Sequence, residues 1–484
     1  MFNIRYNLFI IQLLTFIPLL FFSIFYFLVP KTIDKNLTLL SIGIFFYFLV
    51  IYFYSIFICR MSKYPFSLTL LFIISYFIVF LQLPVDFLLG SYEESYIFGV
   101  IYDYNLLNLN VLYATVFFGA VIFGIVHQLG VNIKNYSLNS MGTLERKLLP
   151  RQPFFAAFYL FFVLHLLTIE PSYYFGMHKE DPDGIAGSIL GYFIRILPIC
   201  FGVVIYNAKI QGEQYSFKKF LSLFPKLFLL ILVLFSVGTF LAGDRGPAIR
   251  ALILLVFSFF IISRKSISIF YFFILLFIAG YFLSIIKLIG AVDFRSTDLL
   301  HAFLDAFSRF QTSDKNSSII PFTAELSASF RSYSTAFSLW YNGTSLYGIS
   351  VLTGILMFIP FGVSTLMLVT GLNKQDINAS FLITSYTQES YGLGNSIVGD
   401  ALLNVGFIGA LILAYFIGRL FIAFDFVFYK RTGSVFLYAV GCYFLMNSVI
   451  LARGSFFPHL GSIFFIYLFV YIVLLVSSRI RLSK

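Results

Sequence analysis

The stretch Leu241-Ala-Gly-Asp-Arg-Gly-Pro-Ala-Ile-Arg250 places two arginines and an aspartate between two long apolar runs, 227–243 and 247–263. The turn between these runs is too short to form a soluble loop. A charged side chain at bilayer depth costs roughly 2.5–3.5 kcal/mol even on lenient insertion scales, so we expect this cluster to face a polar cavity or an anion. Because Arg is always protonated and presents a fork of donors, phosphate is a natural partner.

The composition of the 484 residues is that of a membrane protein. Hydrophobic residues make up 60% of the chain and aromatic residues 20%, whereas charged residues make up only 11%. Repeated runs of about 20 apolar residues are the signature of membrane-spanning helices. The first run begins near Asn7 and no small-residue cleavage site follows it, so we expect a retained helix rather than a removable signal peptide.

These runs predict an all-α polytopic protein with about twelve transmembrane helices. We expect the spans at approximately 7–29, 37–58, 66–89, 109–130, 153–169, 186–207, 227–243, 247–263, 269–290, 401–424, 434–451 and 460–478. With both termini in the cytoplasm, 18 of the 32 Lys and Arg residues fall inside, with only three of the 21 acidic residues. This is the positive-inside pattern, so the net charge of +11 signals orientation rather than nucleic-acid binding.

The spans divide the chain into three parts. Residues 1–290 form a bundle of nine helices, 291–400 form one large outer loop, and 401–484 form three closing helices. A semi-apolar segment at 349–371 interrupts the loop and could itself cross the membrane. We prefer a re-entrant or interfacial hairpin packed on protein, because the segment contains Pro360 and several glycines and an extra crossing would invert the charge pattern after it.

The turn at 243–247 is the first candidate site. Pro247 suits the first turn of the following helix, whose N-terminus points backbone donors at an anion. Arg245 precedes the helix and Arg250 lies three residues into it, so both are candidates for binding diphosphate. Alternatively, Asp244 pairs with one of these arginines in a tight helical hairpin. We favour a role in binding for these arginines, because a tight helical hairpin does not need a guanidinium group one turn inside the membrane.

The large loop adds Arg295 and Arg331 as candidates for substrate binding. Arg331 ranks first because hydroxyl and aromatic side chains, of the kind that line sugar sites, flank it in Ala328-Ser-Phe-Arg-Ser-Tyr333. Trp340, Tyr341 and Tyr347 could stack on sugar rings. Surface solvation of the charges and anchoring of the aromatic rings at the headgroup level are the alternatives.

Two further candidates lie at the entry to the span at 401–424. Asp400 and Asn404 are four residues apart and so share one face of a helix, among several glycines. A carboxylate buried beside a cavity there could act as a general base or pair with one of the arginines.

The short outer turn between the last two spans contains Arg453 and His459. Arg453 repeats the placement of Arg245, whereas His459 is either a structural group or a proton carrier at neutral pH. The chain has no P-loop, Rossmann glycine pattern, HExxH motif or Gly-x-Ser-x-Gly elbow, and its three cysteines show no metal spacing. We therefore expect neither a metal nor a cofactor.

Three short motifs stand out: Gly243-Asp-Arg-Gly-Pro247, Gly392-Leu-Gly-Asn-Ser-Ile-Val-Gly-Asp400 with Asn404-Val-Gly406, and Ala452-Arg-Gly454. With these motifs, and with one large outer loop in its second half, the chain resembles the bacterial Wzy-type O-antigen and oligosaccharide repeat-unit polymerases. The likeness in architecture covers most of the chain. A Glu is more usual at the position of Asp400, where the carboxylate chemistry is kept with a shorter reach.

The resemblance implies a GT-C-like or O-antigen ligase-like helical bundle in the bacterial inner membrane. It implies metal-independent glycosyl transfer on the periplasmic face, with donor and acceptor oligosaccharides both carried on undecaprenyl diphosphate. A chain-length regulator protein and membrane lipids are the expected partners, and nucleic acid is not. Diphosphate binding then falls to Arg245, Arg250 and Arg453, and further substrate contacts to Arg331, Arg295, Asn404 and His459. Asp400 or Asp244 is the base or the arginine organiser.

Two other functions share this chemistry. An O-antigen ligase passes glycan from the same lipid to the lipid A core, and its outer loop and use of arginine are similar. A lipid-linked oligosaccharide flippase shares the substrate, but it is expected to have short loops and two related halves. The roughly 110 residues of the single outer loop and the three motifs favour the polymerase.

Overall fold

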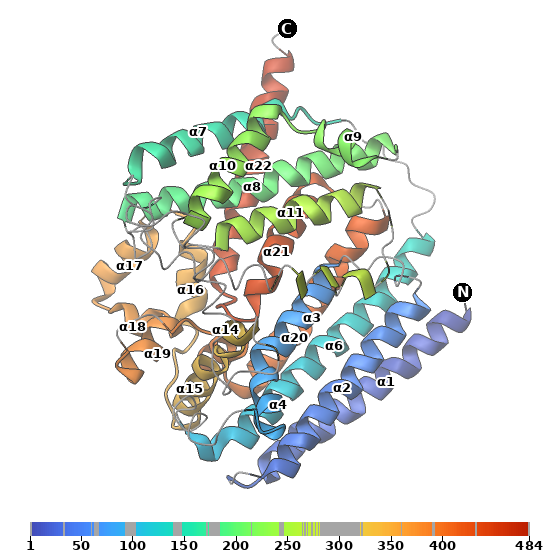
Figure 1. The fold of residues 1–484 in the computed structure, drawn as a ribbon, viewed down its shortest axis with the longest axis vertical. Coiled ribbons are helices and arrows are strands. Elements are labelled where there is room, and N and C mark those ends of the chain that lie inside the picture. Colours follow the sequence, from blue (N-terminus) through green and yellow to red (C-terminus); the bar gives the residue numbers. More distant parts are fainter. Residues whose placement is uncertain are drawn as a thin grey trace.

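The chain folds into a bundle of helices (Figure 1). A computed structural model describes residues 2–31, 34–59, 67–91, 103–138, 148–170, 184–213, 215–241, 246–263, 323–359, 361–389, 393–430 and 433–482, with a few isolated positions between them. Within these ranges there is no β-strand. The first half contains α1 (Phe2–Phe25), α2 (Lys35–Ile58), α3 (Leu68–Phe80), α4 (Gln82–Leu88), α6 (Leu107–Leu138), α7 (Gln152–Thr168), α8 (Gly184–Gln211), α9 (Phe217–Leu221), α10 (Lys226–Leu241) and α11 (Gly246–Ser263).

The second half combines short helices with three long ones. The short helices are α14 (Ala324–Ser327), α15 (Phe330–Tyr341), α16 (Ile349–Leu356), α17 (Gly362–Thr370), α18 (Lys374–Ile377) and α19 (Ala379–Thr387). The long helices are α20 (Ile397–Lys430), α21 (Val435–Leu451) and α22 (Pro458–Leu482). Two 3-10 turns, η1 (Tyr26–Leu28) and η2 (Tyr104–Leu106), extend α1 and precede α6.

The protein is a helical membrane protein. Seven of the described helices are long and apolar enough to cross a bilayer, and α3 with α4 makes an eighth if this pair, bent by 47°, is one span. Three shorter apolar helices, α7, α10 and α21, have 17, 16 and 17 residues. The predicted span at 269–290 lies mostly outside the described residues. The count of twelve therefore stays a prediction.

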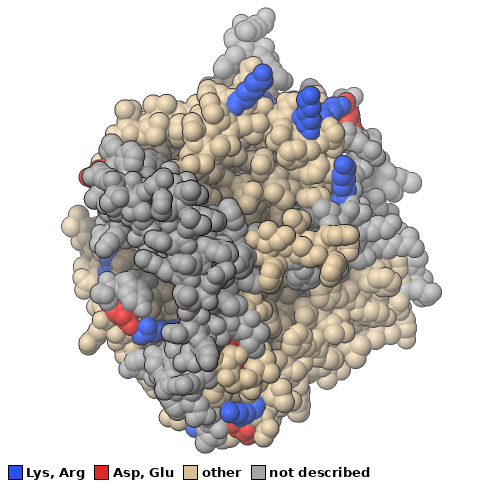
Figure 2. Space-filling model, viewed as in Figure 1, with Lys and Arg blue, Asp and Glu red and all other residues tan. Residues whose placement is uncertain are grey.

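Many large apolar side chains are exposed on the bundle, as a lipid-facing surface requires. On the face in Figure 2, the described residues are mostly neither acidic nor basic, and the few charged side chains lie mostly toward its edges. The two chain ends and α9 lie toward the top and right of Figure 1, and α15 to α19 lie toward the lower left. The side of the membrane on which the termini lie stays a prediction.

The centre of the bundle is α6, which packs along α20, α2 and α1. Two glycines allow the backbones of α6 and α20 to approach each other closely where the helices cross. A Cβ on Gly124 would lie 2.0 Å from the carbonyl oxygen of Tyr415, and a Cβ on Gly418 would lie 2.0 Å from that of Val121. No side chain fits at either position, so small residues set this crossing, as they do in many membrane bundles.

Helix α20 is broken near its start. Gly406 has φ 69° and ψ −174°, a backbone conformation that L side chains rarely adopt. The helix is longer than the predicted span at 401–424, because it begins at Ile397 and continues to Lys430. The short segment before the kink carries Asp400 and Asn404.

The described part of 291–400 is helical rather than an open loop. Helix α15 packs against α20, α3 and α6, and its Tyr333 and Phe337 side chains are fully buried. The segment at 349–371 forms α16 and α17, of eight and nine residues, each too short to cross a bilayer. Helices α16 and α17 form a hairpin, and protein supports this hairpin because α16 packs on α22. The depth of the hairpin in the membrane stays a prediction.

Candidate functional site

A small polar pocket lies where α16, α18, the start of α20 and the turn between α21 and α22 meet. Its volume is ≈40 Å³, which is room for a water molecule or a hydroxyl group. Its polar lining comes from Ser350, Thr353, Asn378, Asp400 and Ser455. We call this cavity the Asp400 pocket, because Asp400 supplies its one ionisable side chain among the lining residues.

Local sequence places Asp400 in the first turn of α20. The Ser396 hydroxyl accepts a hydrogen bond from the Gly399 amide at 3.0 Å and so caps the helix. An acidic side chain in the first turn is also favoured by the helix dipole. Asp400 is only 1% exposed, so its carboxylate depends on hydrogen bonds from the protein.

These hydrogen bonds come from two segments. The Asn404 amide donates to Asp400 Oδ1 at 3.1 Å, as their shared helix face predicts. The backbone N–H of Phe456 donates to Asp400 Oδ2 at 3.1 Å. Asn404 Oδ1 in turn accepts from the Ser350 amide at 3.2 Å. Asp400 and Asn404 therefore join α20 to α16 and to the turn before α22.

Two arginines lie beside this turn. Arg195 on α8 and Arg250 on α11 both interact electrostatically with Tyr443 and His459. The Tyr443 hydroxyl and His459 Nδ1 are 2.6 Å apart and form a hydrogen bond. We call Arg195 and Arg250 the arginine pair.

The arginine pair adjoins the Asp400 pocket. Arg195 Nη1 donates to the carbonyl oxygen of Met357 at 3.2 Å, and Met357 is part of the pocket wall. Pro458 also lines the pocket and directly precedes His459. Cationic and acidic groups thus lie near one another, and within the described ranges no salt bridge joins Asp400 to an arginine.

Of the predicted site residues, the structure brings together Arg250, Asp400, Asn404, Arg453 and His459. Arg453 lies in the same turn as Phe456, where its backbone N–H donates to Ile450. The predicted residues Asp244, Arg245 and Arg295 lie outside the described residues.

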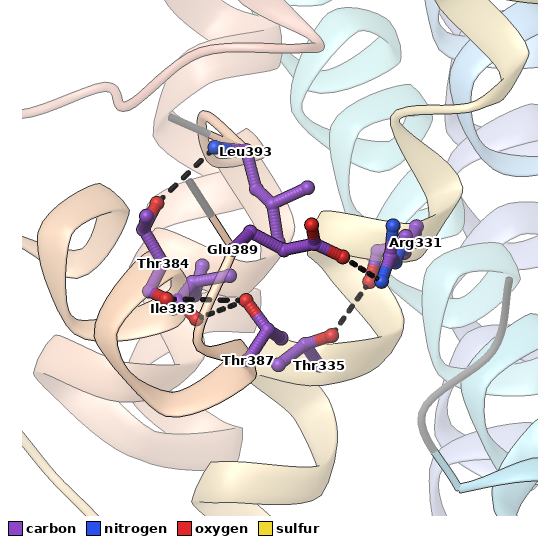
Figure 3. Close-up of polar contacts among 7 residues, drawn as sticks. All are labelled: Arg331, Thr335, Ile383, Thr384, Thr387, Glu389 and Leu393. Carbon is purple, nitrogen blue, oxygen red and sulfur yellow. Dashed lines mark hydrogen bonds and ion pairs between the residues drawn. The ribbon is translucent and has the colours of Figure 1, made fainter. Parts of the chain in front are cut away.

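Arg331 belongs to a different set of contacts (Figure 3). It forms an ion pair with Glu389, which follows α19, and both side chains are about a quarter exposed, at 28% and 26%. Close by, the Leu393 amide donates to the Thr384 hydroxyl at 3.1 Å. The ion pair joins α15 to the chain after α19, so Arg331 has a partner within the protein, and its role in substrate binding stays a prediction.

The aromatic residues proposed to stack on sugars have separate surroundings. Trp340 packs on Tyr113, Phe337 and Phe407. The Tyr341 ring lies under the Lys31 ammonium at 4.5 Å. Tyr347 is 87% exposed and so is the ring still open to a partner.

An open hollow on α18 and α19 has the composition of a sugar-binding surface. Its volume is ≈500 Å³, and amide, hydroxyl and charged side chains line it together with the exposed ring of Phe381, over which Lys374 Nζ lies at 5.3 Å. The amides come from Asn373, Gln375 and Gln388. Sequence reasoning missed this hollow, because the stretch 373–389 has no motif that distinguishes it from an ordinary polar loop.

Sequence reasoning also did not assign a role to Arg195. The signal was available, since an arginine within a predicted span is expensive and calls for a partner. What could not be read from the sequence is that Arg195 and Arg250 approach the same tyrosine and histidine.

No protein-family model, no curated protein and no solved structure matches this chain. Among the described residues, no group of three His, Cys, Asp or Glu side chains is placed to hold a metal ion.

Proposed function

We propose that this protein is a polymerase that joins oligosaccharide repeat units carried on undecaprenyl diphosphate into a surface polysaccharide. It would act on the periplasmic face of a bacterial inner membrane, with both termini in the cytoplasm and twelve spans. The observation that carries the proposal is the meeting of the arginine pair with the Asp400 pocket around the turn before α22.

The reaction is a substitution at an anomeric carbon. A hydroxyl oxygen of the acceptor sugar forms a bond to the anomeric carbon of the donor glycan, and the bond from that carbon to the diphosphate oxygen breaks. Undecaprenyl diphosphate leaves with the electron pair and gains negative charge. Fixed guanidinium groups in a site shielded from water stabilise such charge strongly.

The residues divide the work by their chemistry. Arg195, Arg250 and Arg453 bind the diphosphate, because a guanidinium matches phosphate oxygens with paired donors. Asp400 receives the proton of the attacking hydroxyl, or holds that hydroxyl in place in the pocket. The amide-lined hollow on α18 and α19 accommodates the glycan, with Phe381 against a sugar face. Membrane lipids surround the protein, and a chain-length regulator would be a further partner.

The function is tested by deleting the gene in its host and separating the surface polysaccharide on a gel. Loss of the long ladder with persistence of core carrying a single repeat unit supports the polymerase. Complete loss of capped core indicates a ligase or a flippase instead, and an unchanged ladder rejects all three functions. Complementation with the wild-type chain must restore the ladder.

A further inference from the structure

Arg419 is another arginine within a predicted span. It lies on α20, on the other side of the Gly406 kink from Asp400. Arg419 Nε donates to Gln128 Oε1 on α6 at 2.9 Å, and Arg419 Nη1 lies 3.5 Å from the Tyr415 hydroxyl. The Tyr415 hydroxyl also bonds to His127 Nδ1. We call Arg419, Gln128, Asn132, Tyr415 and His127 the Arg419 cluster.

Some hydrogen-bond donors of this cluster are not used by the acceptors within it. Because Gln128 Oε1 accepts from Arg419, Gln128 Nε2 must be the donor toward Asn132, whose Oδ1 accepts at 2.9 Å. This fixes the orientation of Asn132, so its buried Nδ2 is a donor without a partner. The Arg419 guanidinium has five N–H donors, and within the described ranges no carboxylate forms a salt bridge with it.

A site with unused donors and a net positive charge fits an anion that only accepts hydrogen bonds. A buried or half-buried arginine in a membrane is expensive unless it is paired, and Gln128 and Tyr415 supply no charge. A phosphate diester supplies both the negative charge and several acceptor oxygens, and a guanidinium binds it with two parallel donors.

The approach to Arg419 is apolar and open to the bilayer. One face of α20 carries a row of exposed side chains that ends next to Arg419: Val405, Ile408, Ile412 and Phe416, with 41%, 70%, 53% and 55% exposure. Arg419 itself is half-buried, three residues beyond Phe416. This surface is complementary to an amphipathic anion, whose apolar part can lie along the row and whose charged group can reach Arg419.

We infer that the Arg419 cluster binds the headgroup phosphate of an anionic glycerophospholipid of the cytoplasmic leaflet. Arg419 donates to the phosphate oxygens, and the acyl chains lie along the row from Phe416 to Ile408. With the predicted orientation, Lys430 at the end of α20 lies on the cytoplasmic side. Arg419 is nearer to that side than the apolar row is, so a phosphate at Arg419 and acyl chains along the row have the direction of a lipid in the cytoplasmic leaflet. The inference is independent of the proposed function.

The test is native mass spectrometry of the purified full chain in detergent with added phosphatidylglycerol or phosphatidylcholine. We expect the wild type to retain phosphatidylglycerol preferentially, and Arg419→Gln to lower that retention about tenfold, the scale of one charge-assisted contact. Arg151→Gln is the matched control, because it removes a charge at the predicted cytoplasmic end, where Arg151 Nη1 donates to the Leu223 carbonyl at 3.0 Å.

A second variant keeps the test decisive if Arg419→Gln does not fold. Arg419→Lys retains the charge and removes the paired donors of the guanidinium, so it should lower phosphatidylglycerol retention by a smaller factor in a monodisperse protein. Equal retention of both lipids by the wild type, or wild-type retention by both variants, would overturn the inference. Displacement of the lipid by millimolar inorganic phosphate would overturn it as well, since the ligand would then be a soluble ion.

Discussion

Helix α20 carries a buried aspartate near each of its ends, but the surroundings of the two carboxylates differ. Asp400 and Asp425 are 1% and 0% exposed. Asp425 accepts hydrogen bonds from the Leu68 amide at 2.8 Å and from the amide and hydroxyl of Thr69, so it caps α3. Asp400 also holds a backbone N–H, but it lines a cavity that adjoins two arginines. A buried carboxylate is thus a structural cap at the Asp425 end, whereas Asp400 is the one to which we assign a reactive role in the proposed function.

The difference lies in what surrounds each carboxylate rather than in its burial. All the acceptor capacity that Asp425 uses faces one helix N-terminus, in a packed interior. Asp400 bonds to Asn404 and Phe456, and its surroundings include hydroxyl groups of Ser350 and Ser455 around an empty volume. The adjoining cavity and the nearby charges, not burial, distinguish Asp400 from Asp425.

The largest effect is expected from the arginine pair. Arg195→Gln or Arg250→Gln should reduce polysaccharide chain extension by about 10²-fold or more, the scale for removing one donor that stabilises a developing anion. The readout is the polysaccharide ladder of the deletion strain carrying each variant at wild-type protein levels. Arg151→Gln should restore the full ladder; full ladders from the arginine-pair variants would remove the difference between the two ends of α20.

The aspartates themselves should separate activity from stability. Asp425→Ala should destabilise the protein by about 3 kcal/mol, because it leaves buried donors of α3 unsatisfied. Asp400→Asn keeps the shape and the acceptor toward Phe456 but loses the acceptor toward Asn404, so it should abolish the ladder at a cost of about 1 kcal/mol, less than that of Asp425→Ala. Thermal unfolding in detergent and the ladder measure the two effects. A folded, active Asp400→Asn variant would show that Asp400 is only a cap.

The packing that forms the pocket can be tested at a glycine. A Cβ on Gly354 of α16 would lie 2.3 Å from the carbonyl oxygen of Phe457, so Gly354→Ala should push α16 away from the turn and cost about 1–3 kcal/mol. Gly43→Ala on α2 is the matched control, because its Cβ meets nothing within 4 Å; there alanine should stabilise the helix by up to about 1 kcal/mol. Equal melting temperatures would contradict the close contact of α16 with α22.

The smallest effect is expected at the ion pair of Arg331 and Glu389. Both side chains are partly exposed, so a double-mutant cycle with Arg331→Gln and Glu389→Gln should give a coupling energy of about 1 kcal/mol or less. Thermal unfolding of the four proteins measures it. A much larger coupling would mean that this part of the chain is as tightly built as the Asp425 cap.

The helices of the bundle could be predicted from the sequence because each apolar run carries its own signal. The predicted span at 247–263 and the observed α11 differ by one residue, and 434–451 and α21 differ likewise. The burial of α15 could not be predicted, because its serines and tyrosines are typical of a loop. They find partners only in the fold: Asn110 Nδ2 donates to Ser334 at 2.9 Å, and Tyr333 donates to the Asn110 carbonyl at 2.7 Å.

The site was predictable in part for the same reason. Asp400 and Asn404 are close in sequence, and their helical spacing predicted the hydrogen bond between them. Arg453 and His459 lie in or beside the same turn, and their role in binding stays a prediction. The contact of Asp400 with Phe456 and the approach of Arg195 to His459 join distant segments, so no local pattern reveals them. The kink at Gly406 likewise depends on a backbone angle that a glycine permits but does not require.

The most direct measurement is the binding of undecaprenyl diphosphate to the purified protein in lipid nanodiscs. We predict that the double variant Arg195→Gln with Arg250→Gln binds this lipid at least about tenfold more weakly than the wild type, while Arg151→Gln binds it as the wild type does. Equal affinity of all three folded proteins would contradict the assignment of these arginines to a lipid-linked diphosphate.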